Sequence, residues 1–414
     1  MLRRIKSFIH RRLPRLAFWL GRIKGALAQR ERVVAPDVDP GSFERRRLLI
    51  DVTHTSTAGY LSGIQRVVLK LAQELIADSD RSDFEPVLVR LERSGDALHL
   101  MQAVEFETRV GRPQPASDRA IRIRRGDVLL MLDSSWIEYA LFAKGVFPTL
   151  KQQGGKVISC VYDLIPITHP QFCVKQLALS FSRWVPIMLR SSDGIVCISK
   201  ATQESLEDYL AKQAKPFGGR IGYFHLGGDF DAGLVPPPKR DGGVPTVLMV
   251  GTLEPRKGYA VAFAAFQKLW ARGHQIRLHT CGRFGWSIES LVDEMKASPQ
   301  LGNMLIIDTK VSDEALRKAY AEADLVLSAS FAEGFGLPLV EAAAFGKSLM
   351  VSDIAAYREV CGDHAIYFAT GDADDLAAKL EHWLRERPVI APPRFITWKD
   401  SSQQLLAQIG SMVS

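Results

Sequence analysis

The sequence predicts two α/β domains, each a doubly wound parallel sheet with helices on both faces. Apolar segments rich in Val, Ile and Leu alternate with helical segments in both halves of the 414-residue chain. Near-continuous apolar strands of this kind are typical of parallel sheets that are buried on both faces. Between the halves, the segment 235–245 contains four prolines and two glycines, which predicts a linker. A hydrophobic content of 47% is ample for two cores.

The first half, residues 45–235, is predicted to form an N-terminal Rossmann-like domain. Five apolar strands are expected, and helices separate several of them, such as 63–76 and 200–212. The strands are RLLIDVT (47–53), PVLVRL (86–91), DVLLMLD (127–133), KVISCVYDLIP (156–166) and GIVCISK (194–200).

The second half, residues 245–395, repeats the alternation, and a C-terminal helix is expected at 396–414. Its strands are TVLMVGTL (246–253), QIRLHTCG (275–282), MLIIDTK (304–310), ADLVLSAS (323–330) and KSLMVSD (347–353). Its helices lie near 258–272, 286–297, 312–322 and 338–346. Ligands of doubly wound sheets bind beyond the carboxyl ends of the strands, so the expected site is a cleft between the two domains.

The basic charge is concentrated in residues 1–34. They contain ten Lys and Arg against one acid, a formal charge of +9, so the remaining residues carry −2 of the overall +7. Apolar residues at helical spacing lie between the basic ones, and the longest apolar run is too short to span a membrane. We expect an amphipathic helical segment on an anionic membrane surface. The alternative is a helix packed on the protein with its charges in water.

The composition also limits the classes of protein to which the chain can belong. The nearly neutral remainder of the chain argues against a nucleic-acid partner. The five cysteines show no paired spacing, and Cys160 and Cys197 lie in apolar strands, so they are expected to be reduced core residues of a cytoplasmic protein. No metal-ligand cluster stands out among the nine histidines.

Two loops after C-terminal strands carry charges that suit a phosphorylated ligand. GTLEPRKG places Arg256 and Lys257 just before a helix, where two cations and the helix N-terminus suit a diphosphate. SFAEGFGLPLVEAAAFGK places Glu333 in a glycine-containing loop and Glu341 about one turn into the next helix. The backbone amides of such a loop can point at a ligand. The alternatives are solvated charges and an ordinary strand, turn and helix.

These motifs resemble glycosyltransferase family 4, the retaining sugar-nucleotide enzymes of the GT-B fold. The resemblance rests on the ordered series VGTLEPRKG, CGRFGW, VSDEALRKAYAEADLVLSASFAEGFGLPLVEAAAFGKSLMVSD and YREVCGDHAIYF, which covers residues 246–370 almost continuously. It implies that Arg256 and Lys257 neutralise the donor diphosphate, that Glu341 binds the ribose and that Glu333 faces the transferred sugar. The further donor contacts that it implies are Gly282, Lys310, Val311, Gly334, Phe335, Gly336 and Leu337.

The N-terminal half resembles the family less tightly. DVTHTSTAGYLSGIQRVV is similar to the family's first strand and glycine-rich loop, which implies that Gly63 approaches the diphosphate from across the cleft. VYDLIPITHP is similar to a stretch in which histidine is usual where this chain has Tyr162. Asp163 follows it, and its two readings are a catalytic or acceptor-binding residue and a loop-capping aspartate. His169 and His225 are further site candidates, although a lone loop histidine is more often structural.

The resemblance therefore implies a retaining glycosyltransferase that needs neither a cofactor nor a metal. We expect transfer of a hexose to a glycan or glycolipid acceptor in the synthesis of a surface polysaccharide, on the inner face of the plasma membrane. Mannose is the first choice of sugar, with GDP-mannose as its donor. GDP-rhamnose, GDP-fucose and UDP-sugars are alternative donors. The alternative functions are a phosphorylase or hydrolase that uses the same donor half, and an inactive sugar-nucleotide-binding scaffold.

Overall fold

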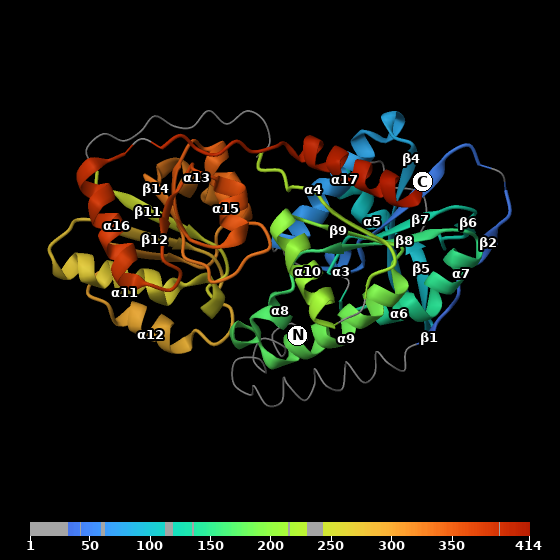
Figure 1. Ribbon diagram of the computed structural model, residues 1–414, viewed down its shortest axis with the longest axis horizontal. Helices are drawn as coiled ribbons and strands as arrows, with labels where there is room; N and C mark the ends of the chain where they lie inside the picture. The colour runs from blue at the N-terminus through green and yellow to red at the C-terminus, as the bar shows by residue number, and fades with distance from the viewer. Residues whose placement is uncertain are drawn as a thin grey trace.

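The computed structural model describes residues 32–41, 43–58, 63–111, 119–134, 136–213, 216–229, 243–388 and 390–414. Two α/β halves lie side by side, the C-terminal half on the left of Figure 1 and the N-terminal half on the right. Most of the predicted basic segment (1–34) and of the predicted linker (235–245) lies outside the described residues.

The N-terminal half is built on an eight-stranded sheet of order β1-β5-β4-β3-β7-β8-β9-β10. Every neighbouring pair is parallel except β4 and β5, which form an antiparallel hairpin. A small parallel pair, β2 and β6, accompanies it. The strands are β1 (Arg32–Val33), β2 (Val38–Asp39), β3 (Arg46–Asp51), β4 (Phe84–Ser94), β5 (Ala97–Gln102), β6 (Ile123–Arg124), β7 (Val128–Met131), β8 (Lys156–Val161), β9 (Gly194–Cys197) and β10 (Arg220–Tyr223).

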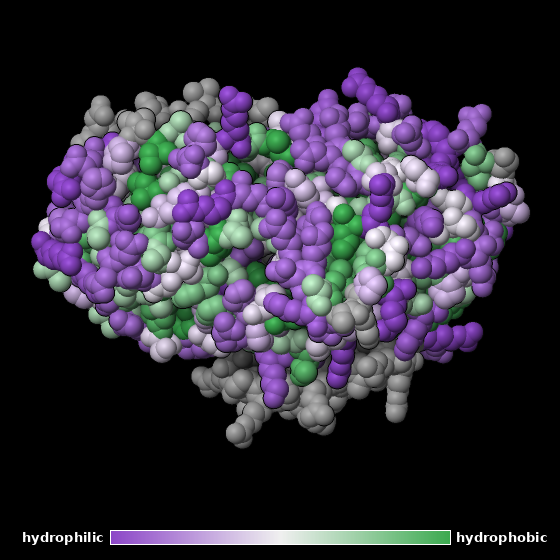
Figure 2. Space-filling model, in the orientation of Figure 1, coloured by the Kyte–Doolittle hydropathy of each residue, from purple (hydrophilic) through white to green (hydrophobic). Residues whose placement is uncertain are grey.

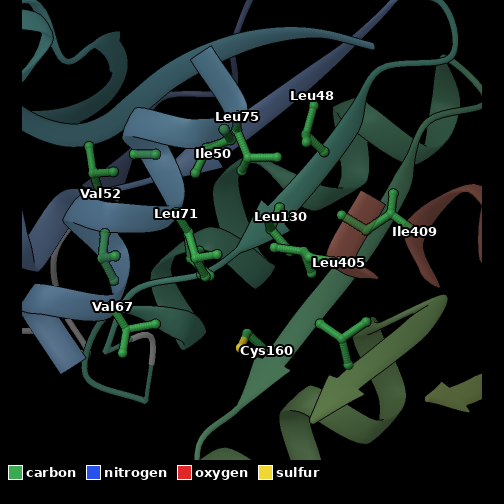
Figure 3. Packing of buried hydrophobic residues seen from close by; sticks show 14 of the residues in the cluster. Leu48, Ile50, Val52, Val67, Leu71, Leu75, Leu130, Cys160, Leu405 and Ile409 are labelled. Carbon is green, nitrogen blue, oxygen red and sulfur yellow. The ribbon is translucent and has the colours of Figure 1, made fainter. Parts of the chain in front are cut away.

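Helices cover both faces of this sheet, as the apolar strands predict. They are α3 (Thr53–Thr57), α4 (Gly63–Ala77), α5 (Val104–Glu107), α6 (Tyr139–Gly145), α7 (Phe147–Gln152), α8 (Ile165–Thr168), α9 (Lys175–Ser191) and α10 (Lys200–Gln213), with 3-10 turns η1 (Ser79–Arg81), η2 (Thr108–Val110) and η3 (Pro170–Phe172). Side chains of β3 alternate between the faces: Leu48 and Ile50 join one core and Leu49 the other. Figure 3 shows the first core, where α4 packs on the strands through Val67 and Leu71.

The C-terminal half is a six-stranded sheet of order β13-β12-β11-β14-β15-β16, and all its strands are parallel. The strands are β11 (Thr246–Val250), β12 (Arg277–Cys281), β13 (Leu305–Asp308), β14 (Leu325–Ser328), β15 (Ser348–Ser352) and β16 (Ile366–Phe368). The helices and the one 3-10 turn are η4 (Pro255–Lys257), α11 (Tyr259–Ala271), α12 (Glu289–Ala297), α13 (Asp313–Glu322), α14 (Leu337–Ala344), α15 (Ala355–Cys361) and α16 (Ala373–Glu386). Both faces of this sheet are again buried, in two separate cores.

The last helix, α17 (Trp398–Val413), returns to the N-terminal half. It begins with a capping box, in which the Thr397 side chain accepts from the Asp400 amide and the Asp400 carboxylate accepts from the Thr397 amide. Leu405 and Ile409 then join the core beside α4 (Figure 3), and the helix lies across the N-terminal half in Figure 1. The chain therefore passes between the two halves twice, once between β10 and β11 and once between α16 and α17.

The expected strands and helices all exist, but most of them are shorter than predicted, the strand at 156–166 most of all. The strand expected at 156–166 ends at Val161, and the short helix α8 begins at Ile165. The apolar run continues because Leu164, Ile165 and Pro166 are buried as well, although they belong to a turn and a helix. Apolar character therefore marked burial here, not strand conformation.

Polar side chains cover most of the face shown in Figure 2, with apolar ones scattered between them. Such a surface is ordinary for a protein in contact with water. No helix among the described residues is long and apolar enough to cross a bilayer.

Candidate active site

A cavity of about 980 Å³ lies between the two halves. Its walls are loops that follow β8, β11, β12, β13 and β14, together with the first turn of α4. Apart from the two candidate histidines, the site residues expected from the sequence line it, namely Gly63, Asp163, Arg256, Lys257, Gly282, Lys310, Val311, Glu333, Gly334, Phe335, Gly336, Leu337 and Glu341. The topology thus brings together residues that lie up to 278 positions apart in the chain.

The turn that carries Arg256 and Lys257 is η4, between β11 and α11. It ends at Gly258, whose φ of +67° is unfavourable for residues with a side chain. A Cβ atom on Gly258 would lie 1.9 Å from the Ala329 carbonyl oxygen, so the turn packs tightly against the end of β14. This close approach brings the two cations beside the Glu333 loop.

Glu333 lies between the two cations. Its Oε2 is 2.8 Å from Arg256 Nη1, its Oε1 is 2.6 Å from Lys257 Nζ, and Oε1 also accepts a hydrogen bond from Ser330 Oγ at 2.7 Å. Burial raises the pKa of the Glu333 carboxyl, but Arg256 and Lys257 outweigh burial and hold it at about 2. The group is therefore a carboxylate at any physiological pH.

Glu254 is a member of this cluster that the sequence analysis missed. It is almost fully buried, and its Oε1 accepts hydrogen bonds from Arg256 Nε at 3.0 Å and Nη2 at 2.7 Å. Burial raises the pKa of Glu254, against the lowering effect of Arg256. Glu254 lies inside the quoted motif GTLEPRKG, and its place two residues before Arg256 was the available signal. It fixes the guanidinium in place from the side opposite Glu333.

Glu341 is held from both halves of the molecule. It lies in the second turn of α14 and is 5% exposed. Its Oε2 accepts a hydrogen bond from Tyr320 Oη at 2.8 Å, and its Oε1 is 2.6 Å from Nη1 of Arg66 in α4. Burial raises the pKa of the Glu341 carboxyl and Arg66 opposes this rise. Arg66 was not identified from the sequence.

Asp163 follows β8 and lies at the turn between β8 and α8, where it faces the cavity. Its Oδ1 accepts a hydrogen bond from the Ile165 amide at 2.9 Å, which caps the start of α8, and the residue also lines the cavity. Burial raises the pKa of the Asp163 carboxyl, and Arg256 opposes this rise. Tyr162 instead donates its phenol hydrogen to the Leu132 carbonyl oxygen at 2.7 Å, inside the N-terminal half. Its side chain is therefore a structural one.

The loop from Gly334 to Leu337 also forms one of the contacts between the two halves. A Cβ atom on Gly334 would lie 2.0 Å from the Tyr162 carbonyl oxygen, so no other residue fits without displacing one half from the other. The Gly334 carbonyl oxygen accepts hydrogen bonds from Ser199 Oγ at 2.5 Å and Thr202 Oγ1 at 2.9 Å. The Phe335 side chain packs into the N-terminal core, which leaves the backbone of this residue for a ligand.

The two candidate histidines do not line the cavity. His225 Nε2 is 2.6 Å from Glu359 Oε1, and the same carboxylate accepts from the first two amides of α10. His169 stacks on Phe172, which in turn stacks on Phe331 of the other half, with ring centroids 4.8 Å apart. Both histidines therefore lie at contacts between the halves.

A group of potential metal ligands, not evident from the sequence, lies beside the cavity. Among the described residues, His279, Cys281 and Asp308 place their ligand atoms within 4.8 Å of one another. His279 Nε2 and Asp308 Oδ2, however, are 2.7 Å apart, which is a hydrogen-bond distance. Two tetrahedral zinc ligands would be about 3.3 Å apart. We therefore describe the group as a hydrogen-bonded pair beside a core cysteine and assign no metal to it.

Two parallel sheets that face each other across a charged interdomain cavity define a GT-B glycosyltransferase fold. The structure matches HepE of Anabaena, solved with UDP and glucose, with a TM-score of 0.58 at 14% identity over 89% of this chain and 97% of that one. It matches sucrose-phosphate synthase of Thermosynechococcus elongatus with a TM-score of 0.58 at 16% identity over 89% and 98%.

Residues 235–396 match the family of glycosyl transferases group 1. A serotype-specific mannosyltransferase WbdA of Escherichia coli is 30% identical over 93% of this chain and 48% of the relative. A phosphatidyl-myo-inositol mannosyltransferase of Mycolicibacterium smegmatis is 36% identical over 36% of this chain and 38% of the relative. The chain thus spans about half the length of the WbdA relatives that it matches.

Proposed function

We propose that this chain is a retaining glycosyltransferase that transfers mannose from GDP-mannose to a glycan or lipid-linked acceptor in surface-polysaccharide synthesis. Several relatives with matching sequence are named as mannosyltransferases, three of them serotype-specific, and another is named as an N-acetylglucosaminyltransferase subunit. The similar HepE structures hold UDP or UDP-glucose, which supports a nucleotide-sugar donor. Because the relatives extend well beyond this chain, activity, donor and acceptor are all part of the proposal.

The observation that carries the proposal is the pair of cations that share one buried carboxylate inside the cavity. Arg256 and Lys257 lie within 2.8 Å of Glu333 and close to the start of α11. Departure of a nucleoside diphosphate places negative charge on the leaving group and positive charge on the sugar. Fixed cations beside the first charge and a permanent carboxylate beside the second stabilise both in the transition state.

Each of the remaining residues binds a different part of the donor. Glu341 accepts hydrogen bonds from the ribose hydroxyls, and the amides from Gly334 to Leu337 bind the sugar and a phosphate. Gly63 leaves open space at the start of α4, since no heavy atom lies within 4 Å of an added Cβ, and this space admits the diphosphate. Gly282, Lys310 and Val311 contact the nucleoside from the loops after β12 and β13. In this arrangement protein cations balance the leaving group, so added chelator leaves activity unchanged.

Asp163 is the proposed proton acceptor for the attacking hydroxyl. It lies on the wall opposite the donor loops, and its raised pKa brings it nearer to neutral pH, where general bases are most effective. Tyr162 cannot take this role, since its phenol is bonded to a backbone carbonyl within the N-terminal half.

The proposal is tested first by ligand binding and then by product analysis. Thermal shifts with GDP-mannose, GDP-rhamnose, GDP-fucose and UDP-sugars should single out one donor, because a ligand at 100 times its Kd adds about 2.7 kcal/mol of stability. The preferred donor is then incubated with lipid-linked or oligosaccharide acceptors, and NMR reads the anomeric configuration. No shift with any nucleotide sugar would overturn the proposal, and an inverted product would overturn the retaining part.

Two alternative functions give different products. A hydrolase would release free sugar without acceptor faster than it transfers sugar, and a phosphorylase would need inorganic phosphate. An inactive scaffold would bind the donor and turn over none. The intact cluster of Arg256, Lys257, Glu333 and Glu341 favours an active enzyme over a scaffold.

Association with an anionic membrane surface is proposed from the sequence of residues 1–34, with its formal charge of +9. Binding to vesicles should then require anionic lipid and weaken with salt, since the Debye length falls from about 10 Å at 0.1 M to about 3 Å at 1 M. A chain without residues 1–34 should lose vesicle binding and keep transfer to a short soluble acceptor. A truncated chain that still sediments with anionic vesicles would contradict the proposal.

A further inference from the structure

Arg66 joins two C-terminal helices from the N-terminal side of the cavity. Its Nη1 is 2.6 Å from Glu341 in α14, and its Nη2 is 3.3 Å from Oδ1 of Asp313 in α13. The Arg66 side chain is 24% exposed, so it remains accessible to a molecule that enters the cavity. The Glu341 carboxylate, by contrast, is 7% exposed and has Arg66 on one oxygen and Tyr320 on the other.

The charged side chains that line the cavity balance one another. The charged residues that line it, among those described, are five bases (Arg66, Arg256, Lys257, Arg283 and Lys310) and five acids (Asp163, Glu254, Asp313, Glu333 and Glu341). Arg256 and Lys257 are already paired with Glu333, and Arg256 also with Glu254. A diphosphate that carries about two negative charges would be balanced better by a further cation that can be redirected towards it, in addition to Lys310 of the lining.

Arg66 is placed to be that cation. It lies three residues after Gly63, which puts both on one side of the first turn of α4, and both line the cavity. Helix N-termini favour anions, and the planar guanidinium fork matches two phosphate oxygens. Arg66 binds Oε1 of Glu341, and Tyr320 donates to the other oxygen, Oε2. A ribose hydroxyl that binds Glu341 would therefore also have to approach Oε1. Binding of ribose at Glu341 and release of Arg66 are thus linked by competition for one atom.

We propose that Arg66 is a donor-binding residue that exchanges partners. Arg66 pairs with Glu341 across the two halves, and on donor binding the ribose replaces it there and the guanidinium moves to the diphosphate. This inference rests on the proposed function, because it needs a donor with both a ribose and a diphosphate. It adds a cation from the N-terminal half to a donor site whose other charged residues come from C-terminal loops and helices, and so couples donor binding to the arrangement of the halves.

Calorimetry with four probes, GDP, guanosine, UDP and uridine, tests this exchange. In Arg66→Ala, the affinity for the nucleoside diphosphate that the wild type prefers should fall at least about tenfold, the scale of one lost charge-assisted hydrogen bond. Affinity for the corresponding nucleoside should stay the same or rise, because Glu341 is released. Arg66→Gln, which can still donate to Glu341, should lose diphosphate affinity without the gain for the nucleoside.

The matched control is Arg272→Ala, which removes an arginine from an exposed pair with Glu381 outside the cavity lining. It should change none of the four affinities. Equal losses for nucleoside and diphosphate in Arg66→Ala, or no loss for either, would overturn the exchange while leaving the proposed function in place. A wild-type chain that binds no nucleoside diphosphate would overturn the proposed function and the exchange with it.

Discussion

The two walls of the cavity are built differently. On the C-terminal wall, Arg256, Lys257 and Glu333 contact one another within a single half, through loops that follow neighbouring strands. On the N-terminal wall, Arg66 contacts residues of the other half, and the side chains of Ser199 and Thr202 bind a carbonyl oxygen there. One wall is therefore preassembled, whereas the other depends on the contact between the halves. Changes in the first should affect stability and transfer together, and changes in the second should affect binding or transfer with little effect on stability.

The largest effect is expected for Glu333→Gln, because it leaves Arg256 and Lys257 without their shared carboxylate. Breaking such a buried pair costs about 3–5 kcal/mol of unfolding free energy at pH 7. The pKa of Glu333 is about 2 in the folded protein, below its ordinary value of 4.5, so its stabilisation is complete above pH 4.5 and is lost as the pH falls towards 2. In urea unfolding experiments, the difference in unfolding free energy between wild type and Glu333→Gln should shrink as the pH is lowered from 7 to 3.

Glu381→Gln is the matched control for that experiment. Glu381 is exposed and pairs with Arg272 and His274 on the surface, where such pairs contribute little. Its effect should be below about 1 kcal/mol at every pH. If Glu333→Gln were equally mild, the C-terminal wall would not be a preassembled network.

Replacement of the cations comes next. Lys257→Ala and Arg256→Ala should each lower kcat/KM by about 10²- to 10³-fold, because transition-state charge on the diphosphate loses a fixed partner. The double variant should lose less than the product of the two, since both act on the same charge. Steady-state transfer assays measure this, and fully multiplicative losses would show that the two cations act on separate groups.

Asp163→Asn tests the N-terminal wall and should lower kcat by about 10²-fold, the lower range for lost general-base catalysis. Donor affinity and unfolding free energy should stay close to wild type, because the amide oxygen still accepts from the Ile165 amide. Transfer assays and donor calorimetry on the same samples separate the two quantities. A loss of donor affinity with unchanged kcat would assign Asp163 to the donor and remove it as the base.

Gly334→Ala should have the smallest effect and acts on the contact between the walls. Its Cβ would meet the Tyr162 carbonyl oxygen, so the halves must separate slightly, at about 1–3 kcal/mol for such overpacking. Transfer should weaken while the C-terminal wall stays intact, which nucleotide calorimetry can check. Gly410→Ala in α17 is the control, because no heavy atom lies within 4 Å of its added Cβ. A variant at Gly334 with wild-type melting and transfer would show that the contact is dispensable.

Much of the C-terminal wall could be predicted from the sequence because its chemistry is local. Arg256 and Lys257 are neighbours in one turn, and Glu333 and Glu341 lie on either side of one glycine-containing loop. Their order along the chain maps directly onto neighbouring parallel strands, whose carboxyl ends all lie at one edge of the sheet. The alternation of apolar strands and helices likewise determined the two doubly buried sheets.

The N-terminal wall was decided by tertiary structure. Arg66 looks like any solvated arginine of an amphipathic helix, and only the placement of α4 opposite α14 brings it to Glu341, 275 positions away. Tyr162 occupies a motif position and lines the cavity, but its phenol hydroxyl is bonded to the Leu132 carbonyl oxygen inside the N-terminal half. Contacts between distant segments depend on how the two halves meet, and no local pattern of residue types records that geometry.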